Sequence, residues 1–146
     1  MNITYENSIK KLMFLGNFEN FPNVQKSIKF DLSKISKLLD YCNNPQKNQK
    51  FIHVAGTNGK GSTSAIISKC LIGSDLKVGF FSSPSMHKIT ERIQINNRSI
   101  PEKDFANELN NIWPIILKMS KDENLKISFF EAINVMALNY FRKKKV

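Results

Sequence analysis

The sequence is poor in cysteine, in histidine and in long apolar runs. Its two cysteines, Cys42 and Cys70, have neither Cys-x-x-Cys spacing nor paired histidines near them, which argues against a disulfide framework and against a zinc site. No apolar run approaches the roughly 20 residues needed to cross a bilayer, and the first residues lack the apolar core of a secretion signal. We therefore expect a cytoplasmic protein with reduced, partly buried thiols and no membrane partner.

What is present is enough apolar material for a core and a large excess of positive charge. Of the 146 residues, 41% are hydrophobic, and the formal net charge is +10. A basic surface attracts nucleic acids, but also nucleotides and acidic metabolites. The lysines are scattered along the chain, and its densest basic run is Arg142 to Lys145. This distribution favours a solvated surface over a nucleic-acid interface.

The pattern of apolar and turn-forming residues predicts an α/β fold. Apolar spacing indicates helices over 5–15, 31–42 and 60–72, whereas short β-branched runs indicate buried strands at 51–56 and 77–83. A strand, a turn, a helix and a second strand in this order form a βαβ unit with two parallel strands. We therefore expect a mostly parallel sheet flanked by helices.

The second half of the chain continues with a hairpin and two helices. The segment around Asn96-Asn97 alternates and indicates a short hairpin or an extended excursion. Helices are expected over 101–119, kinked or interrupted at Pro114, and over 128–145. The last of these helices carries apolar residues on more than one face and should be covered on both sides.

The stretch "HVAGTNGKGSTSA", His53 to Ala65, joins the first predicted strand to the next helix. It resembles a phosphate-binding loop, although the strict Gly-x-x-x-x-Gly-Lys-Ser/Thr pattern fails at Val54 and Gly61. Backbone amides at a helix N-terminus bind phosphate, and glycines let the chain approach the oxygens. We predict that ATP phosphates bind to this loop, with Lys60 as the charge that meets them; His53, in the strand, is interpreted as a structural histidine. The predicted phosphate-binding residues are Thr57, Asn58, Gly59, Lys60, Gly61, Ser62 and Thr63.

Together with "FFSSPSMHKITERIQINNRSIP", this loop is similar to the folylpolyglutamate synthase and dihydrofolate synthase family of the Mur ligase superfamily. That family has His-Val-Ala-Gly-Thr-Asn-Gly-Lys-Gly-Ser-Thr, then Ser-Pro, then Glu-Arg-Ile. The corresponding residues are 53–63, Ser83-Pro84 and 91–93. Gly61 distinguishes the loop from that of the cell-wall Mur ligases, which usually have Thr or Ser there. The residue after Ser-Pro, usually His or Phe, is Ser85.

The resemblance implies an ATP-dependent ligase that adds L-glutamate to dihydropteroate or to a folate. In such enzymes ATP phosphorylates a carboxylate, and the amino group of glutamate attacks the acyl phosphate. Lys60 would neutralise charge during phosphoryl transfer, and Ser83 would bind Mg²⁺ through its hydroxyl. The pterin would face two segments, with Phe129 or Phe130 packing on its ring: Lys29, Phe30, Asp31 and Leu32, and Ser128, Phe129, Phe130 and Glu131.

The resemblance also implies a domain organisation. Residues 1–48 would form a helical pterin-side segment and 49–146 the start of the phosphate-loop α/β core, an incomplete Mur-ligase ATP-binding domain with the C-terminal domain absent. On this interpretation the chain is an N-terminal fragment that binds ATP but does not complete the reaction. A monomer without nucleic-acid partners is expected. The alternatives are another Mur-type amino-acid ligase, or a stand-alone nucleotide- or nucleic-acid-binding module.

Overall fold

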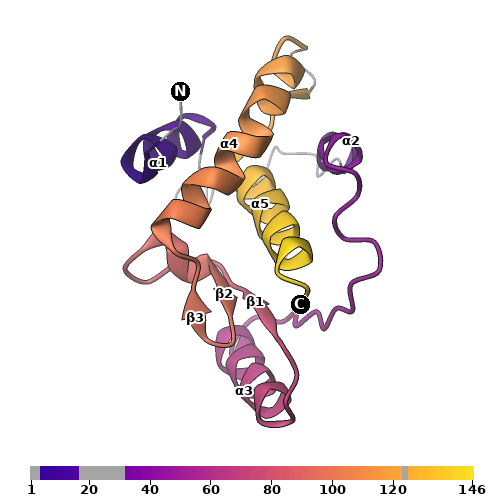
Figure 1. Cartoon of the computed structure of the whole chain (residues 1–146), viewed down its shortest axis with the longest axis vertical. Helices are drawn as coiled ribbons and strands as arrows, with labels where there is room; N and C mark the ends of the chain where they lie inside the picture. Colours follow the sequence, from indigo (N-terminus) through magenta and orange to yellow (C-terminus); the bar gives the residue numbers. More distant parts are fainter. Residues whose placement is uncertain (1–3, 17–31, 123–124) are drawn as a thin grey trace.

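The computed structural model describes residues 4–16, 32–122 and 125–146, which form a group of helices with a small sheet at one end. Figure 1 shows the long helix α4, Glu102–Met119, between α1, Tyr5–Phe14, and α5, Phe129–Lys143. Helix α2, Ser33–Tyr41, packs against α4 and α5. Helix α3, Lys60–Gly73, lies below the sheet at the far end of the molecule (Figure 1).

Helices α1 and α4 begin at residues that favour a helix start. Thr4 precedes α1, and its hydroxyl accepts a hydrogen bond from the Asn7 amide at 3.4 Å. Helix α4 follows Pro101 and has Glu102 and Asp104 in its first turn, where negative charge favours the helix dipole. The predicted interruption at Pro114 does not occur, since α4 runs through this residue. Among the described residues, no helix is both long enough and apolar enough to traverse a bilayer.

The sheet has three short strands in the order β1-β2-β3, and both pairings are antiparallel. They are β1, Gly79–Phe81, β2, Ile93–Ile95, and β3, Arg98–Ser99. A short 3₁₀ helix, η3, Ile89–Arg92, leads into β2. The predicted hairpin is confirmed: Asn96 and Asn97 connect β2 to β3 with φ values of 48° and 61°. Such a pair of positive φ angles is what a two-residue type I′ turn requires.

The mixed α/β class is confirmed, but the predicted parallel pair of strands is not found in the described part of the chain. Residues 51–56 have no regular secondary structure, and β1 pairs with β2 in the antiparallel direction. A strand holds its shape when its backbone N–H and C=O groups pair with a neighbouring strand. The β-branched pattern at 51–56 was therefore insufficient to specify a strand.

The core lies between the helices and β2. It contains Leu12 from α1, Leu38 from α2, Phe105 from α4 and Ile93 from β2, all fully buried. Helix α5 is covered on more than one face, as its sequence predicts. Its buried side chains are Phe129, Ala132, Ile133, Val135, Met136, Ala137, Tyr140 and Phe141.

Strand β1 meets α5 at a position where only glycine fits without adjustment. A Cβ atom added to Gly79 would lie 2.9 Å from Cδ1 of Phe141, which is closer than two carbon atoms approach without strain. This contact sets how closely the sheet and the last helix approach each other. It therefore also sets where the chain just after β1 lies relative to α5.

Candidate nucleotide-binding site

The predicted phosphate loop leads directly into α3. Gly59 is the N-cap of this helix and has φ = 74°, a left-handed conformation that residues with a Cβ adopt rarely. The amide of Thr63 donates to the Gly59 carbonyl at 2.9 Å and so closes the first helical turn. The first turn thus begins at Lys60, and the amides of Lys60, Gly61 and Ser62, which precede this bond, are those that lack partners within a helix.

The Lys60 ammonium folds back over its own loop. Its Nζ atom donates to the carbonyl of Gly56 at 2.5 Å and to that of Thr57 at 3.0 Å. The positive charge therefore lies beside the N-terminus of α3, where the helix dipole already favours an anion. Lys60, Gly61, Ser62 and Thr63 are all exposed, so the loop is open to a ligand from solvent.

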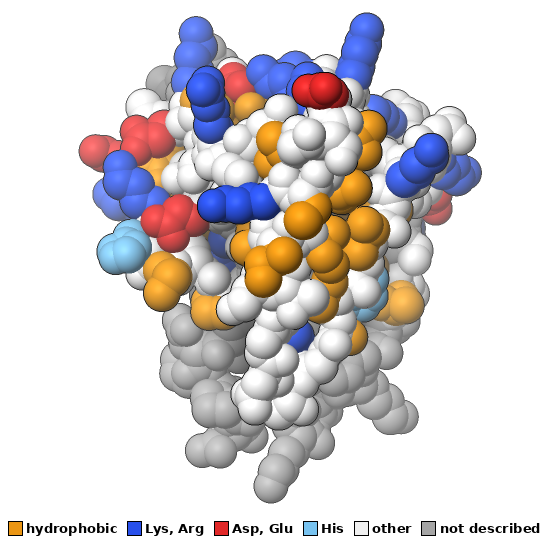
Figure 2. All heavy atoms as spheres, turned by 90° about the horizontal axis from the view of Figure 1, so that it is seen from below, with side chains coloured by type: hydrophobic (Ala, Val, Ile, Leu, Met, Phe, Trp, Pro, Cys, Tyr) orange, Lys and Arg blue, Asp and Glu red, His pale blue; other side chains and the backbone are white. Residues whose placement is uncertain are grey.

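The surroundings of the loop are exposed and apolar. Phe51 has 60% of its surface accessible, and Ile52, Ile66 and Leu76 are exposed to a similar degree. Figure 2 views the molecule from the end at which α3 lies and shows hydrophobic side chains gathered on this face. His53 is exposed as well, so the interpretation of a buried structural histidine is wrong. The reason is the same as for the missing strand: within the described residues, no neighbouring strand covers 51–56.

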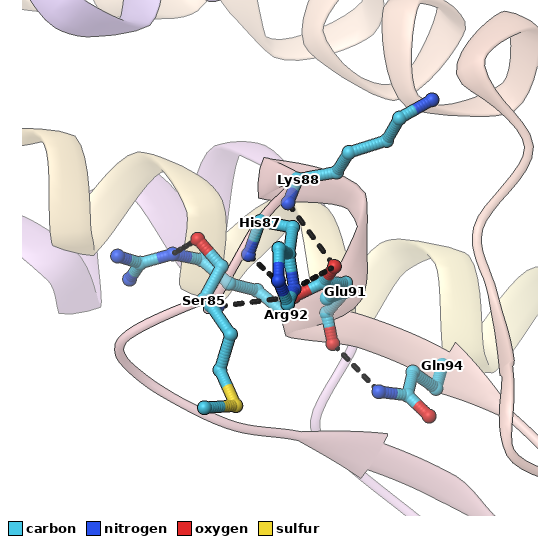
Figure 3. A network of polar contacts seen from close by, with 7 residues as sticks. Ser85, His87, Lys88, Glu91, Arg92 and Gln94 are labelled. Atoms are coloured by element: carbon cyan, nitrogen blue, oxygen red, sulfur yellow. Dashed lines mark hydrogen bonds and ion pairs between the residues drawn. The ribbon is translucent and has the colours of Figure 1, made fainter.

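The segment after β1, residues 82–88, is held from one side by Glu91. The carboxylate of Glu91 accepts hydrogen bonds from three successive backbone amides, those of Met86, His87 and Lys88, at 3.0–3.1 Å (Figure 3). The bonds from His87 and Lys88 lower the pKa of this carboxyl group most. His87 itself is largely exposed, and its Nδ1 lies 3.8 Å from Oε1 of Glu91.

Arg92 holds the same segment from the other side. Its Nη1 donates to the Ser83 hydroxyl at 3.2 Å and its Nε to the Ser85 hydroxyl at 3.4 Å. Its guanidinium carbon lies 5.1 Å from the centre of the Phe129 ring, and the residue is only 4% exposed. Sequence reasoning matched Glu91 and Arg92 to the family motif but assigned neither a role. Their signal was the motif itself, since neither residue follows from hydrophobic periodicity.

The predicted pterin-side residues differ in exposure and in their contacts. Lys29, Phe30 and Asp31 lie outside the described residues, and Leu32 is exposed just before α2. Ser128 and Glu131 cap α5 reciprocally, because the Glu131 carboxylate accepts from the Ser128 amide at 2.8 Å and from its hydroxyl at 2.7 Å. The carboxylate of Glu131 is thus engaged at the start of its own helix.

The two phenylalanines of this segment differ sharply in exposure. Phe129 is 1% exposed and packs in the core beneath Arg92, whereas Phe130 is 41% exposed. The Phe130 ring lies 6.1 Å from that of Phe81, at the end of β1. Of the two candidates for stacking on a pterin, Phe130 therefore has the accessible ring.

A pocket of about 380 Å³ lies beside Arg92. Helix α1, the segment after β1, η3 and the starts of α4 and α5 contribute to its wall. The residues lining it are Tyr5, Ile9, Met13, Ser85, His87, Lys88, Ile89, Arg92, Glu102 and Phe129. Its wall combines apolar side chains with the charged groups of Lys88, Arg92 and Glu102.

Ser83 fits a magnesium ion only together with phosphate. In the described part of the chain, no three His, Cys, Asp or Glu side chains cluster as a metal site. The Ser83 hydroxyl is a hard oxygen of the kind that Mg²⁺ accepts. The Arg92 guanidinium 3.2 Å away disfavours a second bare cation there. When Mg²⁺ is bound to nucleotide phosphates, their negative charge compensates for the two cations. Ser83 and Arg92 therefore fit a metal–nucleotide complex.

Comparison with known proteins places this geometry in a family. No protein-family model matches the chain. The chain is 36% identical over 115 residues to the dihydrofolate synthetase of Saccharomyces cerevisiae. The aligned region covers 79% of this chain and 26% of that protein. The crystal structure of folylpolyglutamate synthase from Thermotoga maritima superposes with a TM-score of 0.83 at 33% identity, over 97% of this chain and 32% of that one.

A solved FPGS-AMPPCP-folate complex superposes equally well, with a TM-score of 0.83 at 30% identity, covering 98% of this chain and 33% of that one. The chain belongs to the folylpolyglutamate and dihydrofolate synthase family. It spans about a third or less of the length of these relatives. The predicted family is therefore confirmed, while the roles of the individual site residues stay predictions.

Proposed function

We propose that this chain provides the ATP-phosphate-binding part of a ligase that joins L-glutamate to the carboxylate of dihydropteroate or of a folate. The observation that carries the proposal is the loop at 56–63, with a left-handed Gly59 as N-cap and the Lys60 ammonium beside the helix N-terminus. The names of its relatives and the AMPPCP-folate complex of a structural neighbour support the same assignment. On this proposal ATP and Mg²⁺ act together, and the protein works as a cytoplasmic monomer.

The loop can exchange its internal bonds for phosphate contacts at low cost. Lys60 donates to two exposed carbonyls, and these can bond to water once the ammonium turns to a phosphate oxygen. A charge-assisted bond to phosphate is stronger than one to a neutral carbonyl. The amides of Lys60, Gly61 and Ser62 in the first turn would bind the other oxygens, whereas Thr63, whose amide donates to the Gly59 carbonyl, would offer its hydroxyl.

The reaction proceeds in two displacements. An oxygen of the acceptor carboxylate attacks the γ-phosphorus of ATP, the bond to the β,γ-bridging oxygen breaks, and ADP leaves. The glutamate nitrogen then attacks the acyl carbon, phosphate leaves, and a proton is released as the amide forms. Lys60 would stabilise the charge that develops during the first displacement. A bound Mg²⁺ would supply charge neutralisation at the phosphates, and Ser83 would be its ligand from this chain.

The acceptor would lie at the segment that begins α5. Phe130 offers an accessible ring beside Phe81, and ring faces stack favourably on planar heterocycles. Leu32, with Lys29, Phe30 and Asp31, would complete the pterin side together with Ser128 and Glu131. The buried Phe129 would act only by supporting this surface.

Binding of AMPPCP with Mg²⁺ to the purified chain, followed by calorimetry, tests the loop assignment. We expect Lys60→Ala to weaken binding about tenfold or more, the value of one charge-assisted bond. Lys69→Ala is the matched control, because Lys69 is exposed on the same helix away from the loop. Equal affinity of Lys60→Ala and the unaltered chain would rule out this assignment.

Acceptor binding separates the proposed function from the alternatives. In the presence of AMPPCP, dihydropteroate or folate should bind and a cell-wall precursor should not; the reverse would indicate another Mur-type ligase. Salt-sensitive DNA binding that exceeds AMPPCP binding and survives Lys60→Ala would indicate a nucleic-acid module.

A further inference from the structure

We propose that Arg92 is a positioning residue of this site, which holds the hydroxyls of Ser83 and Ser85 in place and ties them to the first turn of α5. The inference rests on the proposed function, since it gives the orientation of Ser83 a purpose. Its geometric basis is one buried side chain that contacts both the segment after β1 and the helix that would face the acceptor.

A buried guanidinium must have its donors engaged, because an unpaired buried charge is costly. Arg92 uses Nη1 for Ser83 and Nε for Ser85. These two donors belong to one rigid plane, so the two hydroxyls are held at fixed positions relative to each other. Lysine offers a single nitrogen on a flexible stem and cannot reproduce this spacing.

The ring beneath the guanidinium connects this pair to α5. Phe129 lies 5.1 Å below Arg92 and is itself fixed in the core. The neighbouring residue, Phe130, carries the accessible ring of the proposed acceptor side. A displacement of the first turn of α5 would therefore be transmitted to Ser83 through the contacts of Arg92.

Glu91 holds the other end of the segment that Arg92 contacts. Its carboxylate binds the amides of Met86, His87 and Lys88, whereas the adjacent Arg92 reaches Ser83 and Ser85, nearer β1. Figure 3 shows its contact with Ser85. Two consecutive residues of η3 thus hold residues 83–88 at both ends. The hydroxyl of Ser83 is in place before any ligand binds, which reduces the ordering needed on binding.

The test measures how AMPPCP binding to the chain depends on Mg²⁺ concentration. Without Mg²⁺, in EDTA, Arg92→Lys should bind AMPPCP as the unaltered chain does. With Mg²⁺, the metal concentration that gives half of the metal-dependent gain in AMPPCP affinity should rise about tenfold, because the metal ligand has lost its supporting contact. Arg92→Met should show at least the same shift. Arg98→Met is the matched control, because Arg98 is exposed on β3.

Two further variants separate positioning from stability. Phe105→Leu should lower the unfolding temperature without shifting the Mg²⁺ dependence. Glu91→Gln should shift the Mg²⁺ dependence in the same direction as Arg92→Lys and speed amide exchange at Met86, His87 and Lys88. An Arg92→Lys chain that folds and has the unaltered Mg²⁺ dependence would overturn the proposal. Failure of the unaltered chain to bind AMPPCP would overturn the proposed function instead.

Discussion

The helical core and the phosphate-loop region contain similar apolar residues but differ in how far these residues are buried. Most of the large apolar side chains of α4, α5 and β2 are buried or partly buried, for example Phe105 and Ile93. In residues 51–76 they are largely exposed, for example Phe51 and Ile66. Yet the loop keeps a defined conformation, because Gly59 and the Lys60 bonds are local features. Burial therefore decides the arrangement of the core, whereas short-range hydrogen bonds decide that of the loop.

This difference suits the proposed function. A phosphate-binding loop must expose its amides to the ligand, so it cannot be buried in a core. The core instead fixes the frame in which Ser83, Arg92 and Phe130 lie. Substitutions in the two regions should accordingly differ in their effect on stability.

The largest effect is expected from deleting a core ring. Phe105→Ala should lower the free energy of unfolding by about 3–5 kcal/mol, since Phe105 is fully buried and packs edge-on against Tyr5. Phe51→Ala, in the exposed region, should change it by less than about 0.5 kcal/mol. Denaturant unfolding of both variants measures the contrast, and equal losses would contradict it.

A smaller contrast is expected between two glycines. Gly79→Ala should cost about 1–3 kcal/mol, because the new Cβ would meet the Phe141 ring at 2.9 Å. Gly73→Ala, at the end of α3, has open space around the new Cβ and should stabilise the chain by about 0.5 kcal/mol. Thermal unfolding of the pair distinguishes the two signs. A stabilising Gly79→Ala would show that β1 and α5 are less tightly packed than described.

The smallest effect concerns the pH dependence of stability. Glu108 on α4 is 2% exposed, with Lys143 on α5 at 3.4 Å, and burial raises its pKa above the ordinary 4.5. The folded state then keeps the proton at pH values where the unfolded chain has lost it. This contribution is full below pH 4.5 and declines as the pH rises towards the raised pKa.

Replacing Glu108 removes that decline. Glu108→Gln should flatten the fall in unfolding free energy with rising pH in this interval, as measured by denaturant unfolding at a series of pH values. Glu102→Gln is the control, because Glu102 is half-exposed on the same helix. An unchanged profile for Glu108→Gln would contradict the assignment.

Much of the helical framework followed from the sequence. The periodicity of α1, α2, α4 and α5 was sufficient, because each has an apolar face and a start or stop signal. The Asn96-Asn97 hairpin followed from turn chemistry. The strand at 51–56 did not, because strand formation depends on a partner that periodicity alone cannot identify.

For the site, the sequence identified residue types but not their geometry. It pointed to the loop residues and to Ser83, and left Phe129 and Phe130 equivalent. Only packing distinguishes the two rings, since the turn of α5 directs Phe129 into the core and Phe130 towards Phe81. The bonds of Arg92 to Ser83 and Ser85 likewise join residues that no local pattern relates, whereas Glu91 caps η3 three residues after Lys88.

By itself, the sequence determined the family, the glycine and lysine of the phosphate loop, and the helices that build the core. These depend on local conformational preference and on apolar spacing, both of which are written along the chain. The tertiary structure decided that β1 pairs with β2 in the antiparallel direction, that Arg92 is buried between Ser83 and Phe129, and that Phe130 is the accessible ring. The physical reason is that strand pairing and the burial of a charge depend on which distant groups satisfy the backbone and the guanidinium.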